Sequence, residues 1–180
     1  MELESVRLLI KEIGWEDLED IHNLNSLPEV DEYNTQGIPL DTEETKKNIR
    51  PAIEAQKEEK RKSYFWKIIR KDTGEFIGVA GLTLSLNRFK LGEIFYSIHP
   101  EFWGNGFATE LAKALISAGF NHFKLHKVEA GVATENSRSI KVLEKAGMTR
   151  EGRRRKVLPI RGVWKDNFHY AIVEDDPRDY

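Results

Sequence analysis

The chain has 180 residues, of which 39% are hydrophobic and 32% are charged, and its formal net charge is −2. This length allows one sizeable core, and the composition is typical of a globular domain. No overall positive charge points to nucleic acid or to an anionic membrane. The complete lack of cysteine excludes disulfides, a thiolate zinc site and a cysteine nucleophile.

The amino terminus gives no sign of a targeting segment. Residues 1–7 are acidic and lack the basic and long apolar regions of a signal peptide. No apolar run approaches the roughly 20 residues of a membrane helix. We therefore expect a cytoplasmic protein with neither a membrane nor a nucleic acid as partner.

The first half of the chain predicts a strand, two helical segments and a hairpin. Apolar residues alternate over 6–10, and a helix is predicted from Trp15 until Pro28 ends it. A charged helical stretch follows between residues 41 and 63, where Pro51 should kink the helix or divide it into two. Residues 64–82 predict a β-hairpin with its turn at 71–74.

The second half predicts four strands and two helices, and its segments follow in this order: a strand at 93–98, a helix from 108 to 123, a strand at 127–133, a helix at 137–145, and strands near 153–158 and 167–173. The whole order is β-α-α-β-β-β-α-β-α-β-β. It predicts one α/β (α+β) domain over residues 1–180, with its core at about 5–174. A mixed sheet of about six to seven strands would be flanked by helices.

The most informative segment is the turn before the long helix, Trp103-Gly104-Asn105-Gly106-Phe107-Ala108-Thr109. Its glycines let the backbone approach a ligand, and the helix start offers free N–H groups and a dipole that favours anions. A diphosphate suits such a turn, although a plain glycine connection is the alternative. The dinucleotide fingerprint is excluded because Thr109 stands where its third glycine would be.

This segment resembles motif A of the GNAT acyltransferases, Arg/Gln-x-x-Gly-x-Gly/Ala. Gly106 and Ala108 match the small residues, while Trp103 replaces the Arg or Gln, as in the branch of the RimJ/RimL ribosomal-protein N-acetyltransferases. The resemblance continues in residues 6–10, 27–30, 77–81, 92–96, 136–139, 143–148 and 151–153. It implies a GNAT domain that uses acetyl-coenzyme A to acetylate an amine.

The resemblance also implies a divided site for acetyl-coenzyme A. Backbone N–H groups from Gly104 to Thr109 would hold the pyrophosphate. Ile98, at the end of the preceding strand, would hydrogen-bond the pantetheine arm, and Asn136 would contact that arm from the other side. A helix cap is the alternative role of Asn136, and the two roles are compatible.

Candidate catalytic residues come from the same resemblance. Some GNAT enzymes place a general base at the position of Glu93, whose alternative role is a strand-end ion pair. The common tyrosine acid would fall on Leu143, but enzymes of the RimL type use a serine at the position of Ser139, whose alternative is a helix-start serine. A further RimL glutamate falls on Leu158 and is missing here.

Other residues complete the expectations. Tyr33 lies in a loop that often walls the acceptor pocket in this family. We expect no metal site, because His99, His122 and His126 lack metal-ligand spacing. The larger aromatic residues expected in the core are Trp66, Phe76, Tyr96 and Phe120.

An amine attacks a thioester only when it is neutral, so direct transfer in a ternary complex needs a base but no acyl-enzyme. The acceptor would be a protein N-terminus or a small amine, and the protein a monomer or homodimer. The alternative function is a coenzyme-A-binding regulatory or scaffold domain with little turnover. Leu143 and Leu158 favour that alternative, because both remove expected proton-transfer groups.

Overall fold

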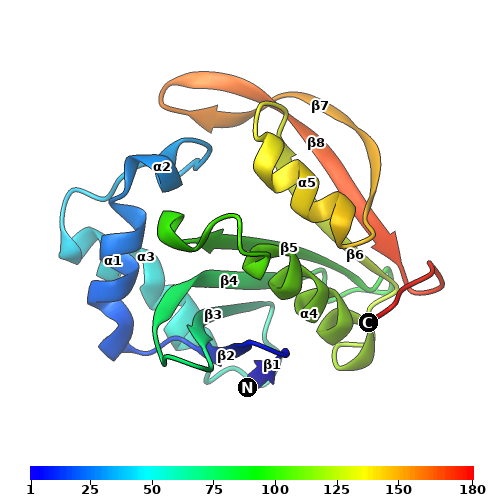
Figure 1. The fold of residues 1–180 in the computed structure, drawn as a ribbon, viewed down its shortest axis with the longest axis horizontal. Helices are drawn as coiled ribbons and strands as arrows, with labels where there is room; N and C mark the ends of the chain where they lie inside the picture. Colours follow the sequence, from blue (N-terminus) through cyan, green and yellow to red (C-terminus); the bar gives the residue numbers. More distant parts are fainter.

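The computed structural model describes residues 1–180 and contains one eight-stranded mixed sheet (Figure 1). Its strands are β1 (Glu2–Glu4), β2 (Leu8–Glu12), β3 (Ser63–Arg70), β4 (Phe76–Leu84), β5 (Leu91–Ile98), β6 (Lys127–Ala133), β7 (Thr149–Ile160) and β8 (Val163–Val173). They lie in the order β1-β2-β3-β4-β5-β6-β8-β7. All neighbours are antiparallel except β5 and β6, which run parallel.

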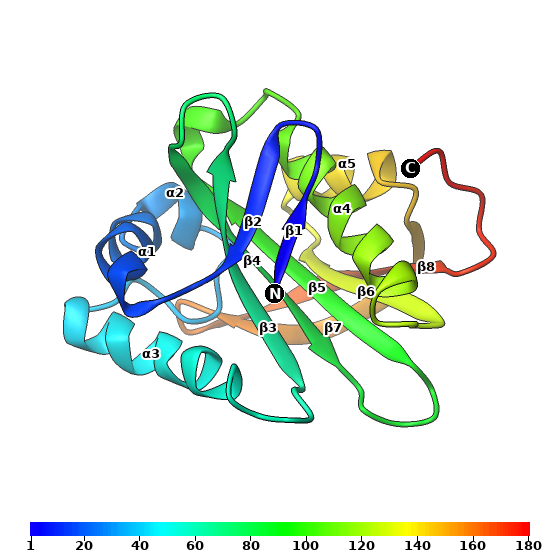
Figure 2. The ribbon, with the colours of Figure 1, turned by 90° about the horizontal axis from the view of Figure 1, so that it is seen from below.

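Five α-helices and two short 3-10 turns connect the strands. The helices are α1 (Leu18–Asn25), α2 (Pro28–Asp31), α3 (Thr42–Ala55), α4 (Phe107–Asn121) and α5 (Ser137–Lys145). The 3-10 turns are η1 (Trp15–Asp17) and η2 (Pro100–Phe102). Helices α1 and α3 lie on one side of the sheet, and α4 and α5 lie on the other (Figure 2).

The sheet therefore separates two hydrophobic cores. The larger core joins the sheet to α4 and α5 and includes Trp66 and Leu111. The smaller core lies under α1 and α3 and includes Ile49. Because successive side chains of a strand point to opposite faces, Val79 of β4 packs into the smaller core and its neighbour Ala80 into the larger one. Burial on both faces explains why β4 is apolar along most of its length.

The predicted fold class is confirmed, with three differences in its elements. β1 adds a strand to the predicted six to seven, and α2 adds one helical turn at Pro28. Pro51 was expected to kink the helix or to divide it into two, and it does not divide it, because α3 is a single helix of 14 residues with Pro51 inside it. Ile49 is buried and Ile53 partly buried against the smaller core, so packing on both sides of the proline offsets its missing hydrogen bond.

The terminal hairpin is longer than its sequence pattern indicates. β7 and β8 meet at a turn formed by Arg161 and Gly162, and β7 begins at Thr149 and β8 at Val163, ahead of the predicted strands near 153–158 and 167–173. The pairing shifts register between Arg150 and Gly152 and again between Arg154 and Leu158, and these bulges interrupt the alternation that marks a strand in sequence. No helix is both long and apolar enough to cross a membrane.

Candidate functional site

The site begins where β5 and β6 part. The two strands pair only over Leu91–Glu93 and Lys127–Glu129. Beyond that point β5 continues to Ile98 beside β4, and β6 continues to Ala133 beside β8. The diverging ends leave backbone groups without a strand partner, and the carboxyl ends of strands at such a crevice are where α/β sheets bind ligands.

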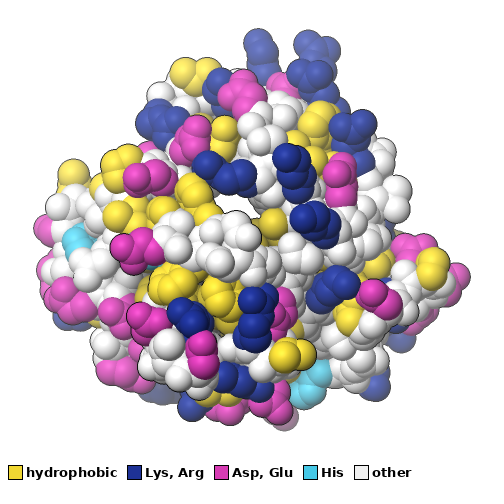
Figure 3. Space-filling model, viewed as in Figure 1, with side chains coloured by type: hydrophobic (Ala, Val, Ile, Leu, Met, Phe, Trp, Pro, Cys, Tyr) yellow, Lys and Arg dark blue, Asp and Glu magenta, His cyan; other side chains and the backbone are white.

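A cavity of about 380 Å³ opens at this divergence. Its walls come from the end of β5, the turn at 102–109, one side of α5, and α2 with Tyr33. Figure 3 shows the surface hollowed at the centre of this face, with Lys and Arg side chains gathered on the α5 side. The volume lies in the range of small-molecule sites, about 300–1,000 Å³.

The glycine turn has the geometry of an anion site. Gly104 and Gly106 have φ values of +78° and +80°, which side-chain-bearing residues rarely adopt. A Cβ on Gly104 would meet no protein atom within 4 Å, so the turn presents open backbone. Helix α4 starts at Phe107 with no side chain capping it, and Glu110 is the first residue whose N–H reaches back to the Gly106 carbonyl. The N–H groups of Phe107, Ala108 and Thr109 are therefore free for a ligand.

Ser5, Arg7 and Glu110 form a hydrogen-bonded network that supports this turn, and we call it the buttress. The Glu110 carboxylate accepts hydrogen bonds from the Ser5 hydroxyl at 2.7 Å and from the Arg7 side chain at 2.6 Å. The Arg7 guanidinium in turn donates to the Asn105 carbonyl at 3.1 Å. Burial alone would raise the pKa of Glu110, but hydrogen bonds from the Arg7 backbone, Ser5 and the Arg7 side chain outweigh it and lower that pKa. The carboxylate thus stays charged and keeps Arg7 against the turn.

Trp103 closes the turn onto the end of β5. Its indole N–H donates to the Ile98 carbonyl at 2.7 Å, and the Arg138 guanidinium lies over its ring at 4.0 Å. The exposed Asn105 side chain donates to the Phe102 and Trp103 carbonyls within the turn. The cavity therefore includes every predicted cofactor residue except Asn105, which shapes the turn without lining the cavity.

Helix α5 forms the opposite wall. The Asn136 side chain caps it by accepting the Ser139 N–H at 3.1 Å, and Asn136 also lines the cavity, so its two predicted roles are geometrically compatible. Three cations, Arg138, Lys141 and Lys145, line the same cavity. Their spacing of three and four residues puts them on one helix face. This spacing was the available signal for a positive wall, and the prediction from sequence did not use it.

Two hydroxyl groups meet in the inner wall of the cavity. The Tyr96 hydroxyl and Ser139 Oγ lie 2.9 Å apart. Tyr96 packs against the larger core, as expected, and it also lines the cavity, which was not expected. Leu143 is 1% exposed within the core, and Leu158 pairs with Lys165 near the β7–β8 turn. Neither leucine belongs to the cavity wall.

Glu93 and Tyr33 lie at different places around the site. Glu93 occupies the last pair between β5 and β6, is exposed, and does not line the cavity. It lies at the apex of the divergence, where a Cβ on Gly131 would come within 3.7 Å of its carboxylate. Tyr33 lines the cavity and donates its hydroxyl to the Glu135 carbonyl at 3.2 Å.

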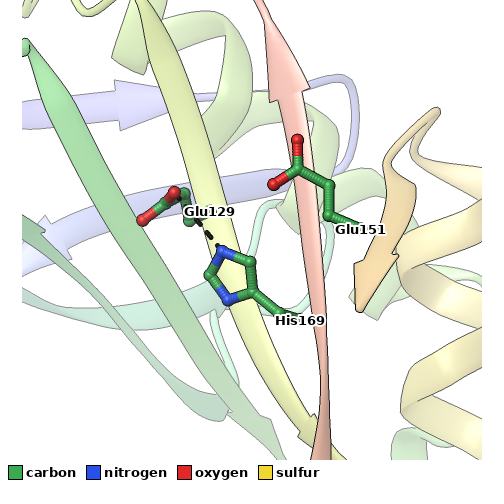
Figure 4. Close-up of side chains that lie close together, drawn as sticks. All are labelled: Glu129, Glu151 and His169. Atoms are coloured by element: carbon green, nitrogen blue, oxygen red, sulfur yellow. Dashed lines mark ion pairs between the residues drawn. The ribbon is translucent and has the colours of Figure 1, made fainter. Parts of the chain in front are cut away.

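A separate group of ionisable side chains lies on the sheet beside Glu93. Glu129, Glu151 and His169 come from β6, β7 and β8, and His169 Nε2 lies 3.3 Å from Glu129 (Figure 4). The Lys127 ammonium lies 2.7 Å from Glu151 and 3.7 Å from Glu129. Lys127 thus supplies the positive charge that these carboxylates need, and a metal ion would have to displace it.

Comparison with known proteins accounts for this geometry. Residues 7–149 match the Acetyltransferase (GNAT) domain family. The chain is 34% identical over 173 residues to the uncharacterized N-acetyltransferase YoaA of Bacillus subtilis, covering 96% of each protein. It is also similar to the crystal structure of a GNAT-family acetyltransferase from Bacillus anthracis, with a TM-score of 0.84, 28% identity, and coverage of 97% of this chain and 99% of that one.

Two further solved structures share the fold. The ribosomal-protein-S5-alanine acetyltransferase of Vibrio fischeri has a TM-score of 0.82 at 22% identity, with 99% of each chain covered. The spermidine N-acetyltransferase of Vibrio cholerae, solved with CoA and spermine, has a TM-score of 0.81 at 23% identity, covering 94% of this chain and 97% of that one. On the family match and the full-length relative, the chain belongs to the GNAT family and is an acetyl-coenzyme-A-dependent N-acetyltransferase.

Proposed function

We propose that the protein transfers the acetyl group to the primary amine of a protein N-terminus or of a small molecule, by direct attack in a ternary complex. The observation that carries the proposal is the shared cavity, which combines an uncapped helix start, diverging strand ends and three cations. The helix start and the cations match the phosphates of the donor, and the diverging strand ends match its extended arm.

The turn and α5 would bind the donor between them. Backbone N–H groups from Gly104 to Thr109 hold the pyrophosphate, since a diphosphate needs many donors and little side-chain bulk. Trp103 fixes the turn through its bond to Ile98. Ile98 and Asn136 flank the pantetheine arm from the two sides of the divergence. The cations Arg138, Lys141 and Lys145 add long-range attraction for the phosphates.

Proton transfer would involve Glu93, where β5 and β6 part, and Ser139, in the first turn of α5. Glu93 acts through a water molecule to take a proton from the acceptor ammonium, which must be neutral to attack. A backbone N–H at the end of β5 stabilises the negative charge that develops on the carbonyl oxygen. The Ser139 hydroxyl donates a hydrogen bond to the departing thiolate. The C–N bond forms, the C–S bond breaks, and the proton lost by the amine ends on sulfur.

The acceptor approaches past Tyr33, which lines the cavity beside α2.

One observation favours a second candidate function, a coenzyme-A-binding domain with little turnover. Leu143 is buried in the core, so the proton donor that many GNAT enzymes carry at this position is missing. We rank transfer first because the Tyr96–Ser139 pair brings hydroxyl donors into the cavity from other elements.

Thiol release in the presence of acetyl-coenzyme A separates the two candidates. The acceptors are peptides with free N-termini, the same peptides with acetylated N-termini as matched controls, and a set of small amines. Release with free peptides alone supports a protein N-terminus, and release with small amines alone supports a small-molecule acceptor. Tight binding by calorimetry without release from any acceptor would favour the binding domain.

The Glu93→Gln variant tests the base in the same assay. Loss of a general base lowers the rate by about 10²–10⁴-fold. We expect the loss to be largest below neutral pH, where more of the acceptor is protonated and needs the base. Turnover equal to that of the wild type between about pH 6 and pH 9 would remove Glu93 from the mechanism.

A further inference from the structure

Two hydroxyl groups that are 43 residues apart in sequence share a hydrogen bond in the cavity wall. Tyr96 lies on β5, two residues before Ile98, and Ser139 lies in the first turn of α5. The Ser139 backbone N–H is already committed to the Asn136 side chain at 3.1 Å. The pair therefore links the strand that edges the divergence to the helix that forms the opposite wall.

A hydroxyl pair with one shared hydrogen bond leaves one proton free. A phenol is more acidic than an aliphatic alcohol and is the stronger donor, while a serine hydroxyl can rotate to suit its surroundings. The favoured arrangement has Tyr96 donating to Ser139 Oγ. The Ser139 proton is then the free one, and it is available to a ligand in the cavity that both side chains line.

We propose that Tyr96 is a positioning residue for acetyl transfer, whose phenol holds Ser139 so that the Ser139 hydroxyl donates to the sulfur of coenzyme A as the thiolate departs. The proposal deepens the proposed function and rests on the role of Ser139 given there. It supplies from the sheet the phenol that Leu143 cannot supply from α5. Leu143 lies one helical turn beyond Ser139 and is buried in the core.

The Tyr96 phenol acts by hydrogen bonding and keeps its own proton. Burial raises the pKa of Tyr96 to about 12, against the smaller lowering effect of the bond with Ser139. An alkyl thiol such as cysteine has a pKa of about 8.5. Transfer of the phenol proton to a thiolate is therefore uphill. Sulfur keeps the electron pair of the broken C–S bond, and its proton comes from the amine nitrogen through solvent.

The thiolate form of bound coenzyme A gives a test that needs no acceptor. Calorimetry would compare coenzyme A with desulfo-coenzyme A from about pH 7 to pH 9.5, a range that spans thiol ionisation. The wild type should gain affinity for coenzyme A relative to the desulfo analogue as pH rises. One hydrogen bond to a charged group corresponds to at least about tenfold in affinity. The charged cavity residues Glu29, Arg138, Lys141 and Lys145 also act on the thiolate, but they are the same in the wild type and the variants, so the difference between proteins reports the hydroxyl pair.

Three variants and one control complete the design. Tyr96→Phe and Ser139→Ala should each lose most of the pH-dependent gain, and the double variant should lose no more than Ser139→Ala alone. Tyr170→Phe is the matched control, because its phenol also donates a buried hydrogen bond, to Glu144 at 3.0 Å, but outside the cavity. This control should lower thermal stability and leave the pH dependence unchanged.

The proposal is overturned if Tyr96→Phe keeps the wild-type pH dependence, or if the wild type shows none. It is also overturned if the losses of Tyr96→Phe and Ser139→Ala add in the double variant, because independent effects mean that Tyr96 does not act through Ser139. Failure of the proposed function would look different. The pH-dependent gain would persist while no acceptor released thiol from acetyl-coenzyme A.

Discussion

Replacing Gly106 with alanine separates the backbone role of the turn from its ligand role. A side-chain-bearing residue in the left-handed conformation costs about 1–2 kcal/mol. A Cβ on Gly106 would lie 3.5 Å from the Arg7 guanidinium, which is ordinary contact and adds no clash within the protein. For a chain of 180 residues each kcal/mol lowers Tm by about 2–4 °C, so we expect a fall of about 2–8 °C.

Gly74 offers a matched control for this variant. Its φ is +73°, it lies in the β3–β4 turn away from the cavity, and a Cβ on it would meet nothing within 4 Å. Gly74→Ala should therefore lose similar stability and keep its affinity for acetyl-coenzyme A. Gly106→Ala should lose one or two hydrogen bonds to charged phosphates as well, which corresponds to about 10–100-fold in Kd by calorimetry. Equal Kd values for the two variants would refute the assignment of this turn to the pyrophosphate.

Three further predictions concern the surroundings of the cavity. Glu110→Gln should destabilise the protein by about 1–3 kcal/mol at neutral pH. Because the folded pKa of Glu110 is lowered, its contribution is fully present above the unfolded value of about 4.3 and is lost as pH falls through the lower folded value, so acid denaturation curves of variant and wild type should converge below the folded value. Trp103→Phe removes the bond to the Ile98 carbonyl and should raise KM for acetyl-coenzyme A about fivefold with little change in kcat, and an unchanged KM would contradict its role in the turn. Tyr33→Phe should raise KM for the acceptor a few-fold and leave the calorimetric Kd of acetyl-coenzyme A unchanged, whereas a change in that Kd would place Tyr33 in the donor site.

Much of the fold could be predicted because its signals are local. Strands buried on one or both faces, such as β4, and a long amphipathic helix such as α4 follow from period and apolar content within a short window. Of the two outcomes predicted at Pro51, division of the helix is wrong, because packing against the smaller core holds the helix together and no window around the proline contains that core. β1 was missed because three residues, Glu2–Glu4, carry no periodic pattern.

The candidate site also contains some features that the local sequence indicates and others that it does not. The turn at 103–109 could be predicted as a phosphate site because glycine spacing and the start of a helix are neighbours in sequence. The buttress of Glu110 with Ser5 and Arg7 spans more than a hundred residues, and no local pattern indicates it. Tyr96 was placed in the core for a related reason: alternation along β5 shows which face its ring takes, but not that its hydroxyl ends beside Ser139.

The sequence by itself therefore determined the fold class, the family and the turn suited to the phosphates of acetyl-coenzyme A, because each depends on residues close together along the chain or on segments in a fixed order. Only the tertiary structure decided how the site is completed. The divergence of β5 from β6, the cations of α5 facing the turn, and the hydroxyl pair of Tyr96 and Ser139 all join elements that are distant in sequence. Their positions follow from how helices pack on a twisted sheet, which is a property of the whole chain.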